Sequence, residues 1–264
     1  MLIYSMVCRM YVWYEWNRWD EVREVAYQIM QMTEQYQLDD AWWLLDALET
    51  LADISYRTGN IEESDSLLRQ YNRLAEQRGI KPELSRSIRL AREEWERACA
   101  DFMEALHRSE PFPAPAVLAL LAELVVITGE SVTTQLTLCE RAVALAEQSG
   151  TRKYLAVALR ARGRMYLEQQ QWEEAERDLR EALTHFELLD LPWERGQTLY
   201  CLGSFYTRKA EKVNGTDPEA RAADPGLAQR FFEQALGFFE SLKAVHDATR
   251  ARLALEQDKA AIVQ

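Results

Sequence analysis

The feature that most constrains the fold is a pair of amphipathic helices, best seen between Tyr154 and Leu189, that recurs along the chain. In its first half, apolar or small residues recur at the three- and four-residue steps of one helix face: Leu155, Leu159, Gly163 and Tyr166. After three glutamines, a second such run begins at Trp172 and contains Ala175, Leu179, Ala182 and Phe186. The pattern predicts two closely packed helices joined by a tight turn, with a neighbouring helix approaching the backbone of Gly163.

Similar helix pairs occur before and after this stretch at intervals of 40 to 42 residues. Gly163 and Gly203 occupy equivalent positions 40 residues apart, and Ala122 precedes Gly163 by 41 residues. Met10 and Ala52, 42 residues apart, are equivalent positions in the first two pairs. We expect about five hairpins, and then a last helix from Val245 to Ile262 whose polar face suits the end of a stack.

These hairpins resemble the tetratricopeptide repeat (TPR), whose pattern runs W-x-x-L-G-x-x-Y, then A-x-x-x-F, then A. Leu159, Gly163 and Tyr166 match its first helix, and Ala175, Leu179 and Ala182 match its second. The last hairpin matches through Leu199, Leu202, Gly203, Tyr206, Ala228, Phe232 and Ala235. Arg162 stands at a usually apolar place, and the period exceeds the roughly 34 residues of the family. The resemblance implies an all-α, right-handed superhelical solenoid of TPR-like hairpins.

The chain is expected to form a single solenoid over residues 1–264 with two interruptions. The proline-rich stretch at 109–115 is a possible hinge between 1–108 and 116–264, and the polar segment 209–225 is expected to be a loop insertion. Between residues 82 and 108 the first-helix pattern is missing. Either one long helix or a degenerate hairpin fits there, and the degenerate hairpin is favoured.

Composition and motifs exclude several classes of function. A net charge of −12 argues against nucleic acid as a ligand, and no apolar run is long enough for a membrane helix. Four separated cysteines are typical of free thiols in the cytoplasm. The three histidines lie far apart, and no catalytic, metal-binding or nucleotide-binding motif occurs. We therefore expect no enzyme activity, metal or cofactor.

The positive hypothesis is a concave binding groove lined by the first helix of each hairpin, as in the TPR family. Its expected lining residues are Tyr4, Tyr11, Tyr14, Asp46, Glu49, Asp53, Tyr56, Glu123, Val126, Arg160, Arg164, Leu167, Tyr200, Ser204 and Arg208. The N-terminal half of this set is aromatic and acidic, whereas the C-terminal half carries arginines. This polarity predicts a bound segment with one basic or aromatic end and one acidic end.

The expected function is non-catalytic binding of a protein or peptide segment in this groove, with further docking possible at the aromatic N-terminal edge. The C-terminal part, about residues 115–260, also resembles TPR arms of bacterial signalling regulators of the maltose-activator and STAND ATPase type. That resemblance implies signalling or transcription regulation, and it keeps open a small-molecule-sensing arm of a larger regulator. A homo-oligomerisation module is the third alternative.

Overall fold

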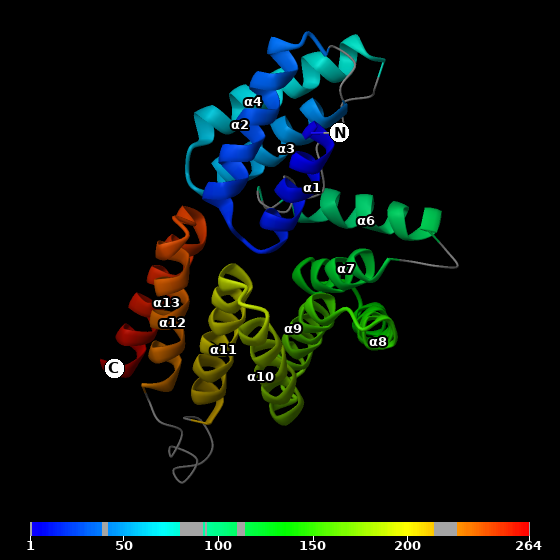
Figure 1. The fold of residues 1–264 in the computed structure, drawn as a ribbon. Helices are drawn as coiled ribbons and strands as arrows, with labels where there is room; N and C mark the ends of the chain where they lie inside the picture. The colour runs from blue at the N-terminus through cyan, green and yellow to red at the C-terminus, as the bar shows by residue number, and fades with distance from the viewer. Residues whose placement is uncertain are drawn as a thin grey trace. The chain divides into compact units, whose positions relative to one another are not determined.

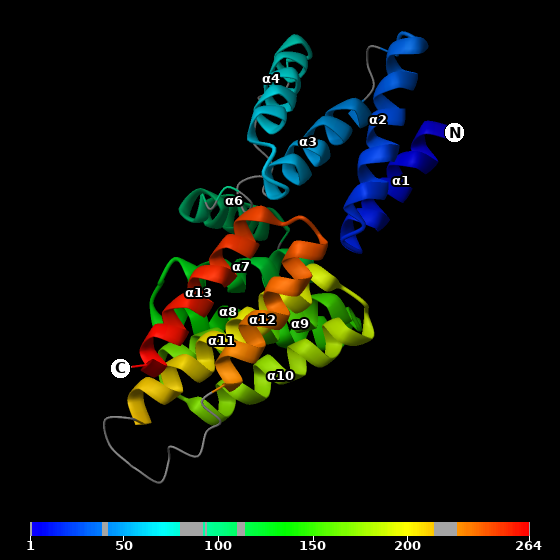
Figure 2. The same cartoon turned by 90° about the vertical axis from the view of Figure 1, so that its left-hand side faces the viewer.

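The computed structural model describes residues 2–38, 42–79, 92, 94–109, 114–213 and 226–263. Over these residues the chain forms twelve helices and no strand, which confirms the predicted all-α class (Figures 1 and 2). Within the same ranges, no helix combines the length and the apolar character that crossing a membrane requires.

The chain divides into two compact units. The first unit, Met1–Glu94 with Leu242–His246, contains α1 (Leu2–Glu15), α2 (Trp19–Gln35), α3 (Trp42–Arg57) and α4 (Ile61–Gln77). The second unit, Trp95–Ser241 with Asp247–Gln264, contains the following helices: α6 (Trp95–Ser109), α7 (Pro115–Ile127), α8 (Val132–Ser149), α9 (Arg152–Glu168), α10 (Trp172–Leu188), α11 (Pro192–Val213) and α12 (Leu227–Ser241). The last helix, α13 (Val245–Val263), starts within the residues assigned to the first unit and continues in the second.

Consecutive helices pack as hairpins within each unit. The pairs are α1 with α2 and α3 with α4 in the first unit, and α7 with α8, α9 with α10 and α11 with α12 in the second (Figure 2). The first helices of successive hairpins also touch, because α1 contacts α3, α7 contacts α9, and α9 contacts α11. This is the packing of a helical repeat protein, in which each hairpin buries its apolar face against the next.

Several hairpins turn through one residue in the left-handed conformation. Gly59, which follows α3, has a φ of +81° and ends that helix as its sequence context predicts. Asn17 after α1 and Gln170 after α9 adopt φ values of +56° and +60° at the corresponding places. The turns are therefore alike although glycine occupies only some of them.

The α9–α10 hairpin is packed as the sequence predicts. Ala175, Leu179, Ala182 and Phe186 of α10 are completely buried. A Cβ atom on Gly163 of α9 would lie 2.9 Å from Leu179 Cγ and 3.2 Å from the carbonyl oxygen of Ala175. The missing side chain of Gly163 is therefore what allows the two helices to approach this closely.

The structure differs from the predicted boundaries at two places. Arg92 lies in a turn and α6 begins only at Trp95, so one helix over 82–108 does not form. Residues 80–91 and 93, on which the degenerate-hairpin prediction depends, lie outside the described residues. The predicted loop 209–225 is helical up to Val213, because α11 continues for one more turn. Its remainder, 214–225, and residues 110–113 of the predicted hinge also lie outside the described residues.

Candidate functional site

Five predicted groove residues of the first unit meet where α1 runs beside α3. Asp46, Glu49 and Asp53 are spaced at three and four residues, which places them on one face of α3. Tyr11 of α1 lies beside Asp46, and the Tyr14 hydroxyl donates a hydrogen bond to Asp53. We call these three carboxylates and two tyrosines the acidic face.

The acidic face carries little compensating positive charge. Arg57, one turn further along α3, pairs with Asp53 at 3.0 Å between Nε and Oδ2. No cation among the described residues pairs with Asp46 or Glu49. The acidic face therefore keeps a net negative charge that a basic ligand could neutralise.

Burial and charge crowding change the proton affinity of the groups in the acidic face. Burial raises the pKa of Glu49 to about 7, and the charges of Asp46 and Asp53 act in the same direction. Burial also raises the pKa of Asp46, although its interaction with Tyr11 opposes the rise. The pKa of Tyr11 is raised by burial and by its interaction with Asp46, so this phenol stays protonated near neutral pH.

In the second unit, the predicted groove residue Arg160 of α9 is the centre of a buried ion-pair cluster. Its side chain is 2% exposed. Its Nε and Nη2 donate to the two carboxylate oxygens of Glu123 on α7 at 2.7 and 3.1 Å, and its Nη1 donates to Glu194 Oε2 on α11 at 2.6 Å. The guanidinium also lies 5.3 Å from the ring centre of Phe186. Arg160 thus links three first helices and is not available to a ligand in this conformation.

The ion pairs determine the charge states within this cluster. Burial alone would raise the pKa of Glu123, but the charge and hydrogen bonds of Arg160 lower it below its ordinary value. Burial alone would lower the pKa of Arg160, but Glu123 and Glu194 raise it. Both groups are therefore ionised at neutral pH, and each depends on the other.

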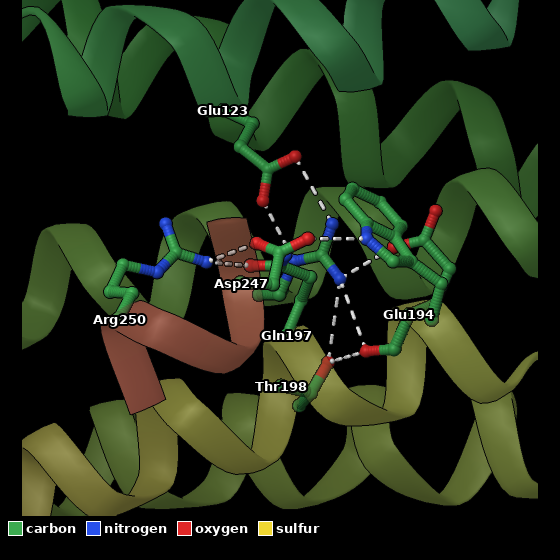
Figure 3. A network of polar contacts seen from close by, with 8 residues as sticks. Glu123, Glu194, Gln197, Thr198, Asp247 and Arg250 are labelled. Atoms are coloured by element: carbon green, nitrogen blue, oxygen red, sulfur yellow. Dashed lines mark hydrogen bonds and ion pairs between the residues drawn. The ribbon is translucent and has the colours of Figure 1, made fainter. Parts of the chain in front are cut away.

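A second polar layer joins α11 to α13 beside this cluster (Figure 3). Trp193 Nε1 and Gln197 Nε2 donate to the two oxygens of Asp247 at 2.9 and 2.7 Å. Arg250 Nη2 donates to Gln197 Oε1 at 2.7 Å and to Asp247 Oδ1 at 2.9 Å, and its guanidinium lies 4.7 Å from the centre of the Tyr200 ring. These contacts extend the polar connection between the helices of the second unit.

The other predicted groove residues are dispersed. Tyr4 and Arg208 are exposed, and Arg208 pairs with Glu168. Tyr56, Arg164, Tyr200 and Ser204 are partly exposed. Val126 and Leu167 are buried, at 8% and 6% exposed, and so belong to the core instead of an outward surface. The structure thus brings together Tyr11 with Asp46, Tyr14 with Asp53, and Glu123 with Arg160.

Sequence reasoning missed the carboxylate partners of three arginines, Arg160, Arg162 and Arg250. Glu194 and Asp247 were not predicted, nor was Asp178, a fully buried residue whose Oδ2 accepts a bond of 2.5 Å from Arg162 Nε. A usable signal was present, because Arg162 stands where the repeat usually has an apolar residue. A charge at a core position requires a buried partner of opposite charge.

The residues that the structure describes do not gather three or more His, Cys, Asp or Glu side chains in a way that could hold a metal ion. The same ranges contain four free cysteines, of which Cys99, Cys139 and Cys201 are buried and Cys8 is exposed. Burial raises the pKa of Cys139 to about 12, so its thiol stays protonated and unreactive.

By its fold and polar clusters, the chain belongs to the class of all-helical repeat proteins. No protein-family model and no curated protein sequence matches it. Among solved structures, it is similar to the crystal structure of BtubC (BKLC) from P. vanneervenii, with 16% identity and a TM-score of 0.41. That similarity covers 82% of this chain and 90% of the other. The function is therefore inferred from the side chains of this chain alone.

Proposed function

We propose that the protein is a non-catalytic scaffold of the TPR type, a right-handed solenoid that binds a segment of another protein. The spacing of Leu159, Gly163 and Tyr166 and the close α9–α10 packing support the repeat type. A role in cytoplasmic signalling or transcription regulation is part of the same proposal and follows the resemblance to regulator arms.

The observation that carries this proposal is the acidic face. Asp46 and Glu49 have no cationic partner among the described residues, and Tyr11 beside them is 45% exposed. Carboxylates next to an aromatic ring favour lysine and arginine side chains through ion pairs and cation–π contacts. The proposed ligand is therefore a peptide segment rich in basic residues.

The structure of the second unit narrows the hypothesis about the ligand that the sequence suggested. The sequence predicted an acidic end of the ligand bound by arginines, but Arg160 is neutralised by Glu123 and Glu194, and Arg208 pairs with Glu168. Arg164 is the one groove arginine that is partly exposed and forms no ion pair among the described residues. A single arginine is a weak site for an acidic segment, so we assign the main recognition to the acidic face.

An immobilised array of 12-residue peptides with varied lysine, arginine, aspartate and glutamate content tests the proposal. We expect binding to rise with lysine and arginine content and to be lost in the double variant Asp46→Lys/Glu49→Lys. The control Glu34→Lys/Glu76→Lys makes the same charge change at two exposed positions on α2 and α4 and should bind as the original chain does. Equal loss in both variants, or no preference for basic peptides, would refute the assignment.

Self-association is a second candidate function, favoured by apolar side chains on α1. Leu2 and Tyr4 at the start of α1 are 63% and 61% exposed, and Trp16, directly after the end of α1, is 54% exposed, which is high for large apolar side chains. Sedimentation velocity of the peptide-free chain separates the two candidates. A dimer that disappears in Tyr4→Ser/Trp16→Ser and persists in the Asp46→Lys/Glu49→Lys variant would assign this edge to self-association.

A further inference from the structure

The contact between α1 and α3 includes a carboxylate that lies between two tyrosine–carboxylate pairs. Tyr11 lies beside Asp46 on one side of Glu49, and Tyr14 donates a hydrogen bond to Asp53 on the other side. Since Glu49 follows Asp46 by three residues and precedes Asp53 by four, it lies on the same face of α3 between the two pairs. The α1 segment from Tyr11 to Tyr14 therefore limits the access of water to Glu49.

Among the described residues, the groups around Glu49 offer it no positive charge. On α3 itself it faces Asp46 and Asp53, and Arg57 is engaged with Asp53 at 3.0 Å. On α1 it faces the hydroxyl-bearing Tyr11 and Tyr14.

The charged groups that join α2 to the α3–α4 hairpin are satisfied elsewhere. Arg23 of α2 pairs with Glu63 of α4 at 3.2 Å and donates to Thr58 at 2.8 Å. Glu63 also accepts a hydrogen bond of 2.7 Å from Ser55. These groups form their own cluster, so ionised Glu49 would be a third negative charge without a counter-charge.

We propose that the α1–α3 contact is a proton-dependent latch, in which protonated Glu49 holds α1 against α3 and ionised Glu49 releases it. The latch is a property of this chain alone and does not depend on the proposed peptide binding. Ionisation favours the open arrangement because opening lets water reach the carboxylate and screen it from the charges of Asp46 and Asp53.

The direction of the pH dependence follows from linkage. The pKa of Glu49 is raised from 4.5 to about 7 when α1 covers it, so the covered state binds the proton more tightly. The closed state is therefore favoured at low pH, and this advantage is lost as the pH rises through about 7. Since each pKa unit corresponds to a factor of ten, opening of α1 should increase by about tenfold to a hundredfold between pH 5 and pH 8.

Amide hydrogen exchange of the intact chain tests the latch. The opening constant of α1 is measured relative to that of α9 in the same sample, because the intrinsic pH dependence of exchange then cancels. We expect this ratio to rise by about tenfold or more between pH 5 and pH 8. Glu49→Gln should keep α1 closed throughout, whereas Glu34→Gln, an exposed position on α2, should behave as the original chain does.

A ¹³C titration of the glutamate carboxyl groups in the unsubstituted chain supplies a second readout that needs no variant of Glu49. A Glu49 resonance that titrates near pH 7 supports the latch. Titration below about pH 5, or an exchange ratio that changes equally in the original chain and in Glu49→Gln, would overturn it. Neither result bears on whether the chain binds basic peptides, so the two proposals can fail separately.

Discussion

At the residue scale, the distance between paired helices is controlled by positions without a side chain. A Cβ atom on Gly203 of α11 would lie 2.6 Å from Cε1 of Phe232 on α12, much closer than two carbon atoms can approach. Phe232 is 3% exposed and in contact with Tyr200, so its ring has little room to move. The glycine is required here for packing, although glycine is a poor helix former.

The expected result for Gly203→Ala is therefore a loss of stability. Overpacking of the α11–α12 interface should lower the free energy of unfolding by about 1–3 kcal/mol, in spite of the better helix propensity of alanine. Urea denaturation followed by circular dichroism measures the change. Gly237→Ala is the matched control, because a Cβ atom there has nothing within 4 Å, and it should stabilise the chain by about 0.5–1 kcal/mol. A stabilised Gly203→Ala variant would contradict this view of the interface.

At the scale of secondary-structure elements, Arg160 connects helices that are not neighbours in the chain. It binds Glu123 on α7 and Glu194 on α11, which are 37 and 34 residues away, and it approaches Phe186 on α10. Such a cluster contributes less to net stability than its bond count suggests, since three charges lose their hydration. It does fix the register of α7, α9 and α11, because a sliding helix would leave a buried charge unpaired.

Removing one member of this cluster should lower the free energy of unfolding far more than removing a nearby, partly exposed charge. Arg160→Ala leaves Glu123 and Glu194 buried without a counter-charge and should cost about 3–5 kcal/mol in the free energy of unfolding. Arg164→Ala, one turn along α9 at a partly exposed position, should cost less than about 1 kcal/mol. Urea denaturation at pH 7 compares the two, and equal effects would show that the Arg160 cluster has no special role.

The effect of Arg160→Ala on the free energy of unfolding should also depend on pH, and the sign of that dependence follows from the pKa of Glu123. The pKa of Glu123 is lowered in the folded chain, so its contribution to stability is present above the unfolded value of 4.5. That contribution is lost as the pH falls through the lower folded pKa. In Arg160→Ala the main cause of the lowering is absent and burial raises the pKa of Glu123, so the sign reverses: the variant should recover part of its lost stability as the pH falls from 7 towards 4.5.

At the scale of the whole molecule, the net charge of −12 and the acidic face give the chain a negative electrostatic field. The proposed recognition of basic segments depends on this field. Ions in solution screen such attraction over about 10 Å at 0.1 M salt and about 3 Å at 1 M.

Binding of a basic peptide selected from the array should therefore weaken strongly with salt. We expect the affinity to fall by about tenfold or more between 0.05 M and 0.5 M sodium chloride, as measured by fluorescence anisotropy. Binding that is unaffected by salt would indicate that apolar contacts of the α1 aromatic residues, and not the carboxylates, carry recognition.

The helical hairpins could be predicted from the sequence because their causes are local. The three- and four-residue spacing of Leu159 and Gly163 predicts a helix face, and Gly59 predicts a helix end, from neighbours within two turns. Ala175 and Leu179, which meet the bare backbone of Gly163, lie in the next helix of the same hairpin, so the close packing could also be predicted. The helix boundary near 92–95 was not, because no strong breaker marks it. The end of α11 at Val213 was predicted several residues too early, although Asn214-Gly215 directly after it is a strong turn signal in the sequence.

The sequence by itself determined the all-helical repeat class and the hairpin turns, and it named the tyrosines of α1 and the carboxylates of α3 only as expected groove residues. Only the tertiary structure decided that Arg160 is buried, since its two carboxylate partners come from other hairpins 34 and 37 residues away. It likewise decided that Glu49 lies between two tyrosine–carboxylate pairs while Tyr4 remains exposed. Periodicity identifies the face of a helix, but the environment of a charge depends on which distant side chains reach it.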